Sequence, residues 1–388
     1  MLIAYMYVAA LTQLFWLNFA SISTYLEDLL RIPPSDIMWL TIVFPAIQVL
    51  LTLPAGIFID RKGFKYGTGV GAVLTGVFAM LRLLGPESFT ILLISQIGIA
   101  IGQPFVLNGV TKLATTWFGA KEEGLAVGLG SFALFIGMLV ALGLTPQLVQ
   151  AAGFSGMLQI YGVLGLLGTP AFLILVKSSP PTSPRIVEDG QSATGWSSIR
   201  QILKVRDMVI LGFIALIGIG VFNGLATWLE TILNELQGMS LSNAGTVSAV
   251  LIVSAMAGCI VMPMLSDRIG RRKPFLIAAT LIGGLSVFLL IFSKSYTLNM
   301  INAIAIGFFF ISALPIMLTM SAEITGPKFA GVSVGYLQLL GNLAAVVLIA
   351  IMENLRSSSG SFVSPILMLV VLMAAAFIIS YFIHDTHP

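Results

Sequence analysis

Long apolar runs follow one another along this chain, beginning at its first residues, and short polar stretches separate them. About twelve runs are long enough to cross a hydrocarbon core of ~30 Å, which takes ~20 helical residues. Transmembrane strands alternate polar and apolar residues over ~10 positions, whereas these runs are continuous, so helices are predicted. The predicted spans are 2–26, 36–59, 66–85, 89–111, 124–145, 154–176, 207–233, 241–265, 274–293, 297–320, 329–352 and 362–383.

The composition agrees with a membrane protein and excludes a soluble enzyme. Of the 388 residues, 57% are hydrophobic and 9% are charged, against roughly 45–50% and about 25% in soluble domains. So few charges cannot cover a water-facing globule, whereas a bilayer favours an apolar exterior. The first run is too long for a signal peptide and lacks a basic leader, so it is predicted to be the first span. The fold class is therefore an all-α integral membrane protein of twelve transmembrane helices.

The loops divide the chain and orient it. Most loops are short, but 177–206 is rich in Pro, Gly, Ser and Thr, which is typical of a linker. It separates an N-terminal six-helix half, 1–176, from a C-terminal half, 207–388. Fifteen Lys and Arg residues fall on one side of the predicted membrane and four on the other. The basic side faces the cytoplasm, which predicts a multi-pass cell-membrane protein with both termini and the linker in the cytoplasm. The four residues on the outer side are Arg31, Arg82, Lys294 and Arg356.

A short charged motif occurs twice, 207 residues apart. The sequence GIFIDRKGFK (56–65) follows the second span, and PMLSDRIGRR (263–272) follows the eighth. A glycine can turn the chain, the aspartate can lie against the positive end of a helix, and the basic residues can hold the cytoplasmic side. The plainer alternative is a charged loop that only signals topology. Two halves repeated in the same orientation are related by an axis along the membrane normal, and the substrate cavity is expected between them.

This repeated motif resembles the signature loop of the major facilitator superfamily, and the resemblance covers essentially the whole chain. It implies the major facilitator fold and transport by alternating access. In that family the aspartate and its basic neighbours stabilise the outward-facing state. The resemblance therefore implies gating roles for Asp60 with Arg61 and for Asp267 with Arg268, although the second copy has Pro263 where the first has Gly56.

A narrower resemblance involves spans 1, 4 and 10. The stretches GQPFVLNG (102–109), TWFGAKEE (116–123) and AEIT (322–325) resemble the feline leukaemia virus subgroup C receptor-related facilitators. That group carries choline, ethanolamine and related small molecules, and haem and pyridoxine have also been proposed for its members. Trp16 and Gln103 match its cavity positions. Where the group has an aromatic residue in span 7 and a glutamine in span 11, this chain has Asn223 and Asn342.

The residues themselves indicate where a cavity is lined, because polar side chains at mid-membrane depth avoid lipid. On span 1, Asn18 and Trp16 lie on roughly opposite faces at ~100° per residue, so both reach one cavity only if the helix bends. The alternative for each amide is a hydrogen bond that only holds neighbouring helices together. The candidate substrate-binding residues are Trp16, Asn18, Gln103, Asn223, Gln338 and Asn342.

Ionisable residues bear on coupling and on chemistry. The two histidines, His384 and His387, follow the last span, and the single Cys259 excludes a multi-cysteine metal site. No carboxylate is predicted near the middle of a span. The best-placed one, Glu230, lies ~15 Å beyond the centre of its helix at 1.5 Å per residue. We therefore expect no catalysis, cofactor or metal, and facilitated diffusion, with Glu230 as the candidate coupling site if transport is proton-driven.

The predicted function is alternating-access transport of a small polar organic solute, favouring a choline-like or amine-bearing metabolite because the ring of Trp16 can accept a cation. The alternatives are proton-coupled import of organic anions and export of amphipathic drugs, in which Arg82 or Lys112 would matter more than Trp16. A signalling receptor is disfavoured because only a few residues follow the last span. The expected partners are the solute and the bilayer, without nucleic acid, and the expected state is a monomer.

Overall fold

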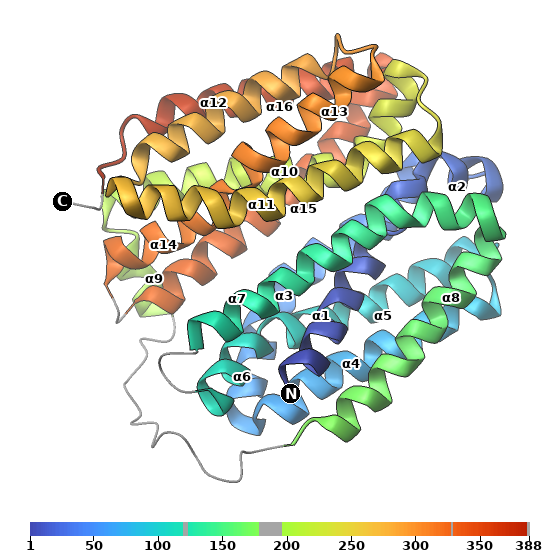
Figure 1. Cartoon of the computed structure of the whole chain (residues 1–388), viewed down its shortest axis with the longest axis horizontal. Helices are drawn as coiled ribbons and strands as arrows, with labels where there is room; N and C mark the ends of the chain where they lie inside the picture. Colours follow the sequence, from blue (N-terminus) through green and yellow to red (C-terminus); the bar gives the residue numbers. More distant parts are fainter. Residues whose placement is uncertain (119–122, 178–195, 327–328, 386–388) are drawn as a thin grey trace. The chain divides into compact units, whose positions relative to one another are not determined.

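The computed structural model describes residues 1–118, 123–177, 196–326 and 329–385, and every regular element in these ranges is helical. The chain divides into two compact units, Met1–Val187 and Glu188–Pro388. The first unit contains α1 (Leu2–Leu17), η1 (Ala20–Ile22), α2 (Ser23–Leu30), α3 (Pro34–Lys62), α4 (Phe64–Leu81), η2 (Arg82–Leu84), α5 (Phe89–Leu107), α6 (Gly109–Trp117), α7 (Glu123–Leu139), η3 (Val140–Leu144) and α8 (Thr145–Leu175) (Figure 1).

The second unit is also built from helices alone in its described part. It contains α9 (Trp196–Ile202), α10 (Arg206–Gln237), α11 (Leu241–Ile269), α12 (Lys273–Leu289), α13 (Tyr296–Ala305), η4 (Ile306–Ile311), α14 (Ala313–Thr325), α15 (Ala330–Ser359) and α16 (Val363–Ser380). Most of the predicted linker, residues 178–195, lies outside the described residues.

Nine helices in the described part of the chain are long and apolar enough to cross a membrane, or ten if α1 and the segment Ala20–Leu30 form one bent span. The apolar helix α12 is slightly shorter, at 17 residues. One of the nine, Ala126–Leu175, has 50 residues, which is roughly 75 Å of helix and more than twice the hydrocarbon thickness.

That long run contains a difference from the prediction. A loop was expected between residues 145 and 154, but α8 already begins at Thr145 and only Gly153, at φ 71°, leaves the helical region. The prediction of a loop over these residues was wrong. Pro146 lies in the first turn of α8, where a helix needs no backbone donor and proline is tolerated.

The first span is bent by 41° between α1 and Ala20–Leu30. The helix breaks at Ile22, with φ −135° and ψ 27°. Two hydroxyls bond the backbone there: Ser21 Oγ donates to the carbonyl of Asn18 at 2.9 Å, and Ser23 Oγ to that of Ala20 at 3.3 Å. Such local bonds compete with the helical ladder and favour a bend. This break follows both Trp16 and Asn18, and Asn18 keeps helical dihedral angles (φ −59°, ψ −37°), so the two residues stay on roughly opposite faces of the helix.

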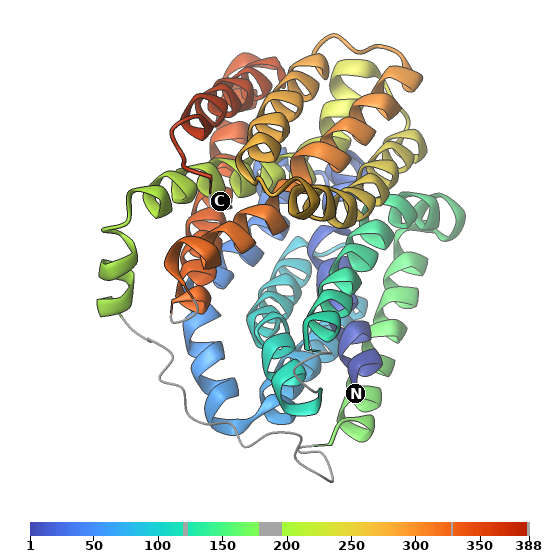
Figure 2. The ribbon, with the colours of Figure 1, turned by 60° about the vertical axis from the view of Figure 1, so that its left-hand side comes forward.

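The two units repeat one packing order. In the first, α1 packs on α7, α3 on α5, and α4 on α8. In the second, the helices at equivalent positions do the same: α10 packs on α15, α11 on α13 and η4, and α12 on α16. Figures 1 and 2 show the helices of each unit lying side by side as a bundle in both views. The internal repeat in the sequence is thus also a repeat in packing.

Glycines let several of these helices approach closely. A Cβ on Gly137 of α7 would lie 2.1 Å from the carbonyl oxygen of Ala10 on α1, and one on Gly307 of η4 would lie 2.1 Å from that of Leu251 on α11. Small residues are favoured where lipid supplies no hydrophobic drive between helices, because close contact maximises dispersion. These contacts fix which faces of the helices remain for polar side chains.

Candidate functional site

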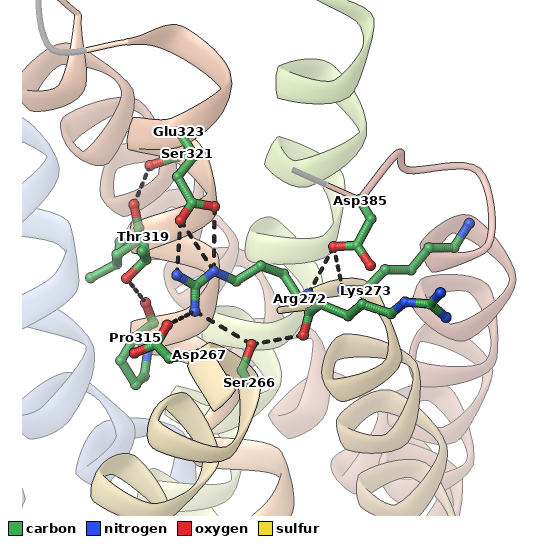
Figure 3. Close-up of polar contacts among 11 residues, drawn as sticks. Ser266, Asp267, Arg272, Lys273, Pro315, Thr319, Ser321, Glu323 and Asp385 are labelled. Atoms are coloured by element: carbon green, nitrogen blue, oxygen red, sulfur yellow. Dashed lines mark hydrogen bonds and ion pairs between the residues drawn. The ribbon is translucent and has the colours of Figure 1, made fainter. Parts of the chain in front are cut away.

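An arginine-centred network joins three helices of the second unit (Figure 3). Arg272, only 5% exposed, precedes α12. Its Nη1 lies 2.5 Å from Asp267 Oδ1 on α11, and its Nη2 lies 2.8 Å from Glu323 Oε1 on α14. Its Nε donates to both oxygens of Glu323 at 3.3 Å. One guanidinium therefore bridges two carboxylates on different helices, which suits its planar fork of donors.

The local sequence explains why Arg272 reaches back to Asp267. Helix α11 ends at Gly270, whose φ of 69° is left-handed and favours glycine. The N–H groups of Gly270 and Arg271 both donate to the carbonyl of Ser266, at 3.0 and 3.3 Å, as in a Schellman-type cap. This turn reverses the chain, so that the side chain of Arg272 lies over the last turn of α11.

The described ion pair of Asp267 is with Arg272, and the gating role of Arg268 stays a prediction. Arg268 is exposed and lies ~100° around the helix from Asp267, whereas the guanidinium of Arg272 is the one that contacts the carboxylate. Hydrogen bonding to Glu323 raises the pKa of Arg272, desolvation opposes the rise, and Asp267 adds to it. Arg272 therefore stays charged at every physiological pH.

In the first unit, the equivalent loop is described only in part. Gly63 ends α3 with a φ of 85°, matching Gly270 in the second copy, so the predicted glycine turn is present in both loops. Arg61 is exposed. The side chain of Asp60 lies outside the described residues, so its pairing with Arg61 stays a prediction.

The bent first span places two candidate residues inside the protein. Trp16 and Asn18 are both buried. The indole Nε1 of Trp16 and both amide atoms of Asn18 have no hydrogen-bond partner among the described residues. Buried polar atoms normally find partners, and each unpaired one costs about 1–3 kcal/mol. These two residues therefore have hydrogen-bonding capacity that a solute or water can use.

Gln103 is buried on α5 next to a close helix contact. Its neighbour Gly102 packs against α4, where a Cβ would lie 2.9 Å from the carbonyl oxygen of Gly71. Adjacent residues on a helix point ~100° apart, so the side chain of Gln103 is directed away from this contact. Pro104 follows it and removes one backbone donor from the helix.

Three candidate residues lie on the tightly packed pair α10 and α15. Asn223 Nδ2 donates to the carbonyl of Ile219 at 2.8 Å, and Asn342 Nδ2 to that of Gln338 at 2.9 Å. Each of these bonds stays within one helix, so neither donor holds the bundle together. Gly341 packs against Ile219, which places Asn342 near Ile219, about one helical turn from Asn223 along α10. Asn223 is buried, and Gln338 and Asn342 are half-buried.

Glu230 lies two turns beyond Asn223 on α10 and is only 3% exposed. At 1.5 Å per residue it is ~13 Å from the middle of α10. Its burial inside the unit was not visible from its position in the sequence. Among the described residues, no group of three or more His, Cys, Asp and Glu side chains is placed to hold a metal ion.

Arg82 is a residue whose importance the sequence underestimated. Counted among the basic residues on the outer side, Arg82 lies near the end of the apolar span Phe64–Leu84 and is only 1% exposed. Its guanidinium carbon is 4.8 Å from the ring centroids of both Phe15 and Phe19, on either side of Trp16 and Asn18. Its Nη2 donates to Gln96 Oε1, while its Nε and Nη1 have no partner among the described residues.

Gln96 connects this arginine to another helix. Its Nε2 donates to the carbonyl of Leu40 on α3 at 2.6 Å while its Oε1 accepts from Arg82. Both ends of the amide are thus occupied by the protein, and Gln96 has a structural role. The signal available in the sequence was the pair Phe15 and Phe19, one helical turn apart on the first span, because arginine stacks on aromatic rings.

Comparison with known proteins agrees with this architecture. The family model described as Major Facilitator Superfamily matches residues 1–349 and 259–388. A crystal structure of a bacterial homologue of the human lysosomal transporter Spinster, inward-facing and unoccupied, has a TM-score of 0.81 at 17% identity, covering 98% of this chain and 96% of that one. That likeness concerns the fold.

Relatives by sequence include both uncharacterised and named transporters. An uncharacterised MFS-type transporter of Caenorhabditis elegans is 26% identical over 95% of this chain, which spans 66% of that protein. An uncharacterised protein of Archaeoglobus fulgidus is 34% identical over 58% of this chain and 98% of its own length. The choline/ethanolamine transporter FLVCR2 of Rattus norvegicus is 23% identical over 92% of this chain and 69% of its own. The family model matches the chain throughout, and the two helical units repeat one packing order and the glycine turn. This chain therefore belongs to the Major Facilitator Superfamily and is a multi-pass membrane transporter, not an enzyme.

Proposed function

We propose that the protein carries a small, amine-bearing organic solute of the choline type by facilitated diffusion. The observation that carries this proposal is the buried indole of Trp16 in the first span, which also contains the buried amide of Asn18, without a partner among the described residues. An indole face attracts an ammonium group, and an unpaired amide can bond a hydroxyl. Relatives named as choline/ethanolamine transporters add support.

The proposed mechanism is alternating access with twelve spans. The nine helices become twelve spans when the bent first span is counted once, Ala126–Leu175 is divided at Gly153, and α12 is included. The halves 1–176 and 207–388 would alternate access to the solute, with Trp16, Asn18 and Gln103 as the proposed binding residues of the first half and Asn223, Gln338 and Asn342 as those of the second. The distribution of basic residues supports cytoplasmic termini in the cell membrane, and a monomer is sufficient for this mechanism.

The gate in this proposal is the pair of cytoplasmic loops. The bridge from Arg272 to Asp267 and Glu323 ties α11 and α14 to the start of α12, and Asp60 with Arg61 would act in the other half. Such ion pairs stabilise one end state over the other only if they differ between the states. We assign them to the outward-facing state, as the family resemblance implies.

Uptake of radiolabelled choline into proteoliposomes tests the proposal. Trp16→Leu should raise KM about 2- to 30-fold, the range that loss of one cation–π contact produces. Trp39→Leu is a matched control, because that tryptophan is 51% exposed on α3. Ethanolamine should compete and a panel of organic anions should not. Saturable choline uptake that is indifferent to Trp16→Leu would contradict the proposed site.

A second candidate substrate class, organic anions, is favoured by Arg82. A fully buried cation is expensive unless an opposite charge or several hydrogen bonds compensate it, and two of its nitrogens are unpaired among the described residues. An anionic group would pair with them. If anions compete for uptake and Arg82→Gln abolishes that competition while Trp16→Leu leaves it intact, the anion reading replaces the choline reading.

A further inference from the structure

The segment that follows α16 is attached to the gate end of the second unit at several points. Asp385 Oδ1 accepts the backbone N–H of Arg272 at 2.8 Å and that of Lys273 at 3.4 Å. Lys273 Nζ donates to the carbonyl of Tyr381 at 2.6 Å. The ring Nδ1 of His384 lies 3.1 Å from both carboxylate oxygens of Asp207, in the first turn of α10. Ile383 is buried in the core of the unit.

Asp385 therefore caps the N-terminus of α12. Arg272 is the N-cap residue of that helix and Lys273 its first residue. The first N–H groups of a helix have no partner within it, and a carboxylate there is favoured both as an acceptor and by the positive end of the helix dipole. The side chain of the N-cap residue Arg272 makes no capping hydrogen bond. The carboxylate of Asp385 supplies the acceptor in its place.

The same residue, Arg272, is held from two directions (Figure 3). Its backbone N–H is bound by Asp385, while its guanidinium is bound by Asp267 and Glu323. The backbone position of Arg272 sets the point from which its side chain must span α11 and α14. Fixing that point lowers the entropy lost when the guanidinium forms both ion pairs.

We propose that Asp385 is a positioning residue of the transport gate, which holds the backbone of Arg272 so that its guanidinium can bridge Asp267 and Glu323. The proposal rests on the gating role assigned above. It makes the segment 381–385 part of the machinery that sets the balance between the two end states. Loss of the cap frees the start of α12, weakens the bridge and shifts the balance away from the outward-facing state.

The experiment compares Asp385→Ala, Asp385→Asn and His384→Ala in the full chain, in nanodiscs. The ratio of the end states is measured by distances between spin labels, on a background in which Cys259 is replaced. Asp385→Ala should lower the outward-to-inward ratio about fivefold, the size of a typical N-cap loss. Asp385→Asn keeps an acceptor and should retain most of the ratio. His384→Ala removes an anchor of the same segment without touching the cap and should change the ratio less than Asp385→Ala.

Two further readouts separate positioning from general stability. Amide hydrogen exchange at Lys273 should speed up in Asp385→Ala and stay slow in His384→Ala. In a background of Glu323→Gln, which already breaks the bridge, Asp385→Ala should have little additional effect on the ratio. Full additivity, or an unchanged ratio in Asp385→Ala, would overturn the proposal while leaving the gate in place. If Glu323→Gln itself leaves the ratio unchanged, the assigned gate is wrong and the positioning role falls with it.

Discussion

Replacing Arg272 by lysine tests the gate most directly, because the charge is kept and only the geometry is lost. The guanidinium reaches Asp267 at 2.5 Å and Glu323 at 2.8 Å with different nitrogens. A lysine carries a single ammonium group on a flexible stem and cannot reproduce this two-sided contact. The variant should therefore keep one carboxylate partner at a time and lose the other.

The size of the effect follows from the exposure of the partners. A hydrogen bond to a charged group contributes about 1.5–3 kcal/mol. The Asp267 side chain is 60% exposed and that of Glu323 is 28% exposed, so water screens part of the interaction. We expect a loss of about 1–2 kcal/mol from the state that contains the bridge, which is a 5- to 30-fold change in the ratio of the end states.

The assay is the distance distribution between spin labels at Tyr66 and Met264, two exposed residues in different units, with Cys259 replaced by serine. Arg271→Lys is the matched control, because Arg271 is the neighbouring exposed arginine. Arg272→Lys should move the population toward the inward-facing distance and Arg271→Lys should not. Equal shifts in both variants, or none in Arg272→Lys, would refute the reasoning.

Two further predictions concern the binding site and coupling. Gln103→Ala should weaken solute binding with little change in thermal stability. Gln96→Ala should instead lower the melting temperature, because it leaves Arg82 and the Leu40 carbonyl short of a partner, at about 1–3 kcal/mol of stability. Isothermal titration and thermal unfolding of both variants test this, and weaker binding in Gln96→Ala than in Gln103→Ala would contradict it. Solute accumulation in proteoliposomes should not follow an imposed pH difference when the membrane potential is clamped to zero. A membrane potential alone concentrates a cation by ~2.3 kcal/mol per charge per 100 mV, which makes the clamp necessary. Accumulation that follows the pH gradient and is abolished by Glu230→Gln would instead make Glu230 the proton site.

The sequence alone determined the class of protein and the repeat. Continuous apolar runs specify membrane helices, because a helix satisfies its backbone bonds within one segment whatever surrounds it. The two motif copies located both glycine turns, and Gly63 and Gly270 adopt positive φ because side-chain-bearing residues rarely can. The sequence left open whether the first span bends, and the structure shows the break at Ile22.

The tertiary structure decided which polar groups meet. The hydropathy of a run is a property of the segment itself and does not identify the neighbouring helix, so it did not show that Phe15, Phe19 and Gln96 enclose Arg82. The pairing of Asp267 with Arg272 depends on a chain reversal and on Glu323, 51 residues beyond Arg272. Contacts over such separations arise from helix packing, where close approach at glycines selects the facing surfaces, and local sequence patterns do not carry that information.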